Sequence, residues 1–120
     1  MDTCVKIDTY FPWDHVDSMV QLVTSAESIP SSGVVCIDFF ATWCGPCKRI
    51  APLFEEFAAK YKDITFLKVD VDESAELVDF FGISAMPTFV FLKDSTLVKR
   101  IEGADARAIV DTLESFAKVM

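Results

Sequence analysis

The chain has 120 residues, 52% of them hydrophobic, and its 19 acidic and 11 basic residues give a net charge of −8. This length and composition suffice for one domain with a substantial core, which we place over residues 1–120. The negative charge argues against a nucleic-acid partner. The sequence also contains no apolar run of the roughly 18 residues that a membrane-spanning helix needs, so we expect no membrane partner.

The N-terminal part predicts a short strand followed by a helix. Val5–Thr9 alternates weakly between apolar and polar residues, and Pro12 then interrupts the pattern. The spacing of the next apolar residues is helical and predicts an amphipathic helix over Asp14–Thr24. The polar segment 25–33, which contains a proline, is expected to be a loop.

The centre of the chain alternates strands with helices. Val34–Ala41 and Ile64–Val71 are nearly continuous apolar runs, typical of strands that are covered on both faces. Cys44–Tyr61 has a helical pattern between these two runs. Glu73–Phe81 is expected to be a second helix, which ends at Gly82 in a left-handed cap.

The last third predicts a hairpin and a final helix. The strands Thr88–Leu92 and Leu97–Ile101 are separated by a turn-like segment, and Ala104–Val119 is again helical. Strands that alternate with helices pair in parallel, and the hairpin adds antiparallel strands. We therefore expect an α/β fold, with a central mixed sheet of about five strands flanked by about four helices.

Two cysteines lie at the expected start of the central helix. Cys44 and Cys47 are separated by Gly45 and Pro46, which favour a tight turn into the helix. The free N–H groups of a helix start favour a thiolate over a thiol, so Cys44 is the expected nucleophile. Cys47 lies on the same helix face and can resolve a mixed disulfide formed at Cys44. The pattern predicts dithiol–disulfide exchange.

A metal site is the alternative use of such a pair. A zinc site usually takes about four ligands in two close pairs, whereas this chain has one close cysteine pair and a single histidine, His15. We therefore expect no metal. The N-terminal residues lack a secretory signal pattern, which predicts a reducing compartment, the cytoplasm. Cys36 in the apolar strand is expected to be buried and inert, and Cys4 to be exposed near the N-terminus.

The segment Trp43-Cys44-Gly45-Pro46-Cys47-Lys48 after an apolar strand, together with a later Met86-Pro87-Thr88, resembles the active site of thioredoxins. The resemblance implies the thioredoxin fold and a protein-disulfide reductase that contributes to cell redox homeostasis. It also implies a monomer without a cofactor. Its substrates would be protein disulfides, and an NADPH-dependent thioredoxin reductase would recycle it.

Asp38 is an acid within an apolar strand, where burial raises a carboxyl pKa. The resemblance implies that it accepts the proton of Cys47, and that Lys68 approaches it from the neighbouring strand. Two other interpretations remain open, in which Asp38 is a structural acid and Lys68 is a surface lysine.

The resemblance also implies a substrate-binding surface around the dithiol. The bond between Met86 and Pro87 would be cis, and the Met86 backbone would pair with an extended substrate segment. The indole of Trp43 would donate a hydrogen bond to Asp72. The other expected residues of this surface are small or apolar: Gly45, Pro46, Ile83, Gly103 and Ala104.

Two further functions are compatible with such a motif. The chain could be an oxidase or isomerase of the same fold, but the Gly45-Pro46 pair and the missing export signal argue against this. It could also be a binding subunit whose thiols are irrelevant, but the intact cysteine pair argues against that.

Overall fold

The computed structural model describes residues 19–119, which form one mixed five-stranded sheet in the order β1-β3-β2-β4-β5. Strands β1, β3 and β2 are parallel, whereas β4 is antiparallel to both β2 and β5. The sheet confirms the predicted combination of parallel strands with a C-terminal hairpin. The strand bounds are β1 Val20–Leu22, β2 Val34–Phe40, β3 Ile64–Asp70, β4 Thr88–Lys93 and β5 Thr96–Glu102.

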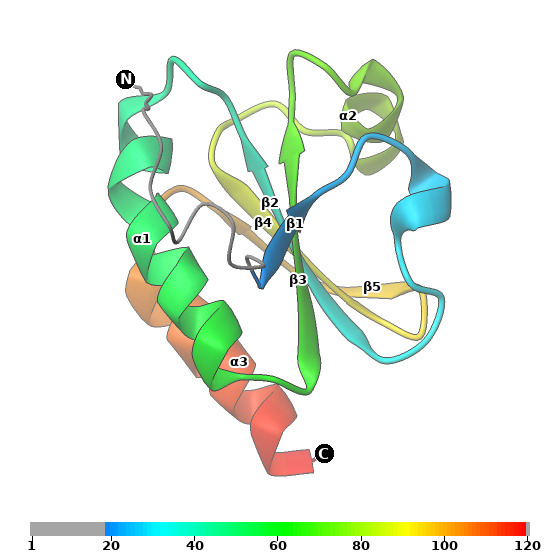
Figure 1. The fold of residues 1–120 in the computed structure, drawn as a ribbon, viewed down its shortest axis with the longest axis vertical. Helices are drawn as coiled ribbons and strands as arrows, with labels where there is room; N and C mark the ends of the chain where they lie inside the picture. Colours follow the sequence, from blue (N-terminus) through cyan, green and yellow to red (C-terminus); the bar gives the residue numbers. More distant parts are fainter. Residues whose placement is uncertain (1–18, 120) are drawn as a thin grey trace.

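Helices cover both faces of this sheet (Figure 1). The two long helices, α1 (Gly45–Lys60) and α3 (Ala106–Val119), lie on one face. The opposite face carries the shorter α2 (Ala75–Phe81) and the 3₁₀ helix η2 (Ala26–Ser28). Both faces of the central strands are therefore buried, as their continuous apolar sequence predicts.

Aromatic residues dominate the two cores. Under α1, the ring of Phe54 packs against Phe66 and Phe89, with ring centroids 5.3 and 5.5 Å apart. Under α2, the rings of Phe39 and Phe81 lie 5.4 Å apart. These contacts hold α1 firmly against the sheet, and this fixes the position of its N-terminus at the carboxyl end of β2.

The helix predicted over Asp14–Thr24 is wrong in its described part, because Val20–Leu22 forms β1. This strand pairs in parallel with β3, and the N–H of Val23 donates to the Lys68 carbonyl at 3.0 Å. Val20 and Val23 are both buried, but on opposite faces of the sheet, because side chains three residues apart in an extended chain point to opposite sides. Residues 14–18 and the strand predicted at Val5–Thr9 lie outside the described residues. The described chain therefore has three α-helices and η2, close to the predicted four helices.

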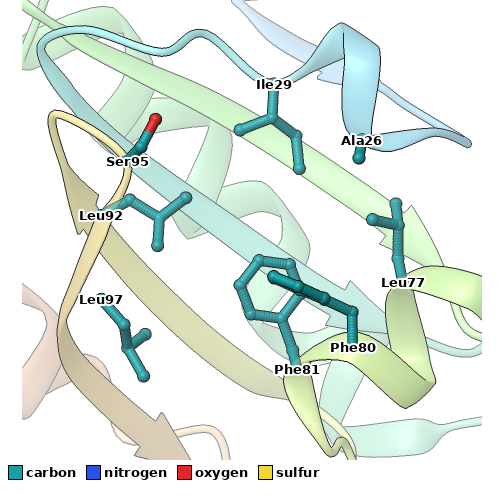
Figure 2. Close-up of a pocket in the computed structure, with 8 residues that line it drawn as sticks. All are labelled: Ala26, Ile29, Leu77, Phe80, Phe81, Leu92, Ser95 and Leu97. Atoms are coloured by element: carbon teal, nitrogen blue, oxygen red, sulfur yellow. The ribbon is translucent and has the colours of Figure 1, made fainter.

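An apolar cavity of about 380 Å³ opens on the α2 side of the sheet, between η2, α2 and the β4–β5 hairpin (Figure 2). Phe80 and Phe81 extend over it from α2. No acidic, basic or thiol side chain lines it, so it offers no group for redox or proton-transfer chemistry. Its lining is Ala26, Ile29, Leu77, Phe80, Phe81, Leu92, Ser95 and Leu97.

Candidate active site

The cysteine pair lies where β2 ends and α1 begins, at the carboxyl edge of the sheet. Cys44 is the N-cap residue of α1, with φ −90° and ψ 115°. The N–H of Cys47 donates to Cys44 Sγ at 3.2 Å. Pro46 occupies the first turn, where its missing N–H leaves no donor unsatisfied. A free N–H of the helix start is thus directed at the sulfur that was predicted to be the thiolate.

Cys44 and Cys47 are joined in a disulfide, with their Cα atoms 5.3 Å apart. Both are buried, at 6% and 4% exposure, and pack with Ala41 against Val71 and Met86. Because little of either residue reaches the surface, a reaction partner must approach along the residues that surround the pair.

The segment around Pro87 forms one side of this approach. The Met86–Pro87 peptide bond is cis, and the Met86 carbonyl oxygen lies 3.7 Å from Cys44 Sγ. The N–H of Gly103, which follows β5, donates to the Pro87 carbonyl at 2.8 Å. The fold thus brings together three residues that are far apart in the sequence and that were predicted to share one surface.

Trp43 lies beside the pair and is 65% exposed. Its indole Nε1–H donates to Asp72 Oδ2 at 2.9 Å, which confirms the predicted hydrogen bond. The N–H of Asp72 in turn donates to Asp70 Oδ1 at 2.9 Å. The loop after β3 therefore holds a large exposed aromatic ring next to Cys44.

Asp38 and Lys68 face each other behind the pair. They are register partners on β2 and β3, and both line a cavity of about 400 Å³ together with Cys47. Asp38 is buried, and its Oδ1 has no hydrogen-bond partner among the described residues. Burial raises the pKa of Asp38 to about 7, although the positive charge of Lys68 opposes the shift. A carboxyl group that changes protonation near neutral pH thus shares a cavity with Cys47.

The remaining expected site residues differ in their positions. Gly45 and Pro46 are exposed at the start of α1, and Ala104 is exposed after Gly103. Ile83 is buried in the core under α2. Ile83 therefore contributes mainly to packing, whereas Gly45, Pro46 and Ala104 offer accessible surface.

Sequence reasoning overlooked Arg100 of β5. Its guanidinium group donates to the carbonyls of Phe81 and Gly82, at 2.6 and 2.7 Å, where α2 ends. An arginine on an edge strand is usually interpreted as a solvated residue. Only its position opposite a helix end could have distinguished Arg100 from such a surface arginine.

The other cysteines and acidic residues offer no second site within residues 19–119. Cys36 is completely buried, and its pKa is raised well above the usual value by burial and then by the negative charge of Asp38. Burial confirms the prediction for this residue, while Cys4 and His15 lie outside the described residues. In the described part of the chain, no cluster of three or more potential metal ligands occurs. No helix in that part has both the length and the apolar character to span a membrane.

Comparison with known proteins identifies the family. The family model described as Thioredoxin matches residues 20–115. Thioredoxin-2 of Saccharomyces cerevisiae is 45% identical over 101 residues, which cover 81% of this chain and 97% of that protein. A peptide-N(4)-(N-acetyl-beta-glucosaminyl)asparagine amidase of Caenorhabditis elegans is 43% identical over 102 residues, or 85% of this chain, and the match spans 17% of that protein's length. The solved structure of a Malassezia sympodialis thioredoxin, 40% identical, aligns with a TM-score of 0.75 and covers 81% of this chain and 90% of that chain. The chain belongs to the thioredoxin family, whose members are thiol–disulfide oxidoreductases.

Proposed function

We propose that this protein reduces disulfide bonds in other proteins, with Cys44 as the nucleophile and Cys47 as the resolving thiol. The observation that carries the proposal is the Cys44–Cys47 disulfide at the N-terminus of α1, beside the backbone of Met86. An N–H of the first helical turn points at Cys44 Sγ, whereas no N–H within residues 19–119 donates to Cys47 Sγ. This asymmetry supports different roles for the two sulfurs.

The reaction has two exchange steps. In the first, the Cys44 thiolate attacks one sulfur of the substrate disulfide; a bond forms between protein and substrate, and the other substrate sulfur leaves as a thiolate. In the second, the Cys47 thiolate attacks Cys44 Sγ in this mixed disulfide and releases the second substrate sulfur. Two electrons pass to the substrate, and the protein retains the Cys44–Cys47 disulfide.

Asp38 accepts the proton that Cys47 must lose before the second step. Its pKa of about 7 lets it take up a proton near neutral pH and return it to solvent through the cavity that it shares with Cys47. Lys68, which faces Asp38 in that cavity, stabilises the carboxylate form. The substrate chain lies along the Met86 backbone and contacts Trp43, Gly45, Pro46, Pro87, Gly103 and Ala104.

The cycle requires an external electron donor, because the dithiol is consumed in each turnover. We assign this role to an NADPH-dependent thioredoxin reductase and place the reaction in the cytoplasm, where it contributes to redox homeostasis and electron transport. The protein itself needs no cofactor, since both electrons are held by its two sulfurs, and it acts as a monomer.

The direct test is the reduction of insulin disulfides with dithiothreitol, followed by the turbidity of the released B chain. We expect the protein at micromolar concentration to shorten the lag before precipitation several-fold, because the thiolate of Cys44 reacts faster than that of dithiothreitol. A time course identical to that of dithiothreitol alone would contradict the proposal and favour a binding subunit or an oxidase.

Pro46 is expected to keep the pair reducing. Replacing Pro46 with histidine should raise the reduction potential, because an imidazole in the first helical turn adds a donor and partial positive charge that stabilise the thiolate. The potential is measured by equilibration with glutathione buffers and separation of the oxidised and reduced forms. Lys48→His places the same ring two residues away and is the matched control. An unchanged potential in Pro46→His would refute this role of Pro46.

A further inference from the structure

The segment 82–87 connects α2 to β4 and ends beside the dithiol. Its Met86 carbonyl oxygen lies 3.7 Å from Cys44 Sγ, so the position of this segment determines where a substrate chain can lie. Residues of β5 and the residue that follows it contact both ends of the segment. Arg100 binds the carbonyls at its start, and the Gly103 N–H binds the Pro87 carbonyl at its end.

The contacts of Arg100 are specific in their geometry. Nη1 donates to the Phe81 carbonyl at 2.6 Å, and Nη2 donates to the Gly82 carbonyl at 2.7 Å. The last carbonyls of a helix lack partners within the helix and carry partial negative charge, so a cation is favourable there. The planar guanidinium group can bind two neighbouring carbonyls at once, whereas a lysine ammonium group has no such fork. The Arg100 side chain is 29% exposed, so these bonds are partly protected from water.

Other hydrogen bonds hold the segment at two points between these ends. Gly82 adopts the left-handed conformation, with φ +63°, and the N–H of Ile83 donates back to the Val78 carbonyl at 3.0 Å. The hydroxyl of Thr88 donates to the Ala85 carbonyl at 2.6 Å. These bonds join Ile83 to α2 and Ala85 to Thr88, and so connect the Arg100 end of the segment to the residues that flank Met86.

We propose that Arg100 is a positioning residue for the thiol exchange reaction: by binding the C-terminal carbonyls of α2, it sets the position of the Met86 backbone against which a protein substrate lies. The inference deepens the proposed reductase function and rests on it. Small disulfides that meet Cys44 without lying along Met86 do not depend on this contact.

The test compares a protein substrate with a small one. Pre-reduced wild type, Arg100→Leu and Arg100→Lys are mixed with insulin or with 5,5′-dithiobis(2-nitrobenzoic acid), and second-order rate constants are recorded. We expect Arg100→Leu to lower the rate constant for insulin about tenfold, because small misplacements of a reaction partner reduce rates steeply. The rate constant for the small disulfide should stay within about twofold of the wild-type value. Lys99→Leu, at the neighbouring exposed position of β5, is the matched control and should change neither rate constant.

Arg100→Lys keeps the charge at the helix end and loses the fork, so its rate constant for insulin should lie between those of wild type and Arg100→Leu. Circular dichroism will show whether Arg100→Leu folds. If it does not, the comparison of Arg100→Lys with wild type provides the test. An Arg100→Lys protein equal to wild type with insulin, or an Arg100→Leu protein slowed equally with both substrates, would overturn the inference. If the wild type reduces neither disulfide, the proposed function itself fails.

Discussion

Replacing Cys44 with serine is expected to reduce the rate of insulin reduction to that of dithiothreitol alone. A serine hydroxyl is not ionised at neutral pH and forms no bond to a substrate sulfur, so the first exchange step is lost. Cys47→Ser should also lose turnover, but for a different reason. Its Cys44 still attacks the substrate, and the mixed disulfide then accumulates because no second thiol resolves it.

The two variants are distinguished by trapping. Each is incubated with an oxidised protein substrate, quenched in acid and analysed by non-reducing electrophoresis and mass spectrometry. Cys47→Ser should show a covalent adduct at Cys44, and Cys44→Ser should show none. Cys36→Ala is the matched control, because it removes a thiol that is completely buried in the core, and it should turn over like wild type. An adduct on Cys44→Ser, with none on Cys47→Ser, would reverse the assigned roles.

Much of the site could be predicted from the sequence because its chemistry depends on local order along the chain. The strand before Cys44, the Gly45-Pro46 turn and the helix after it occupy consecutive residues, and each follows its own residue pattern. The structure places the start of α1 within one residue of the predicted position. The lone acid at Asp38 was informative for the same reason, since a carboxyl group in an apolar strand predicts a raised pKa by itself.

Contacts between distant segments were harder to predict. Val20 and Val23 fit a helical spacing, but an open edge of β3 was available to a parallel strand, and that pairing prevailed over the local pattern. The role of Arg100 depends on where the end of α2 lies relative to β5, about which the spacing of residues says nothing. The hydrogen bond of Trp43 to Asp72 could be expected only through the family resemblance.

Asp38 should make the protein less stable as the pH rises. Its pKa is 3.8 in an ordinary environment and about 7 in the fold. Between these values the folded protein holds a proton that the unfolded chain has released, so the free energy of unfolding falls with increasing pH. The contribution of Asp38 to the free energy of unfolding is fully present below pH 4. It falls progressively as the pH rises and levels off above pH 7. At 1.36 kcal/mol per pKa unit, the total loss is about 4 kcal/mol.

Asp38→Asn removes this titration while keeping the size of the side chain. Burying the amide changes the free energy of unfolding by an amount that does not vary with pH. The difference in unfolding free energy, variant minus wild type, should therefore grow by about 4 kcal/mol between pH 4 and pH 8. Urea unfolding of the oxidised proteins at several pH values measures it. Glu56→Gln, an equal charge change at an exposed position of α1, is the matched control and should give a difference that hardly varies with pH. A constant difference for Asp38→Asn would show that Asp38 ionises normally in the fold.

The same substitution should slow the release of substrate from the mixed disulfide at pH 7, because an amide cannot accept the proton of Cys47. Stopped-flow measurement of tryptophan fluorescence follows this step, because Trp43 lies beside the dithiol and Trp13 contributes a background. An acid that served only the fold would not produce this combination, since its removal would change stability without a matching change in rate. A variant whose stability relative to wild type increases with pH, and which is slower in the second exchange step, therefore identifies Asp38 as a group whose unfavourable burial is maintained for proton transfer. The same increase in relative stability with an unchanged rate would instead leave it as a buried acid without a role in the reaction.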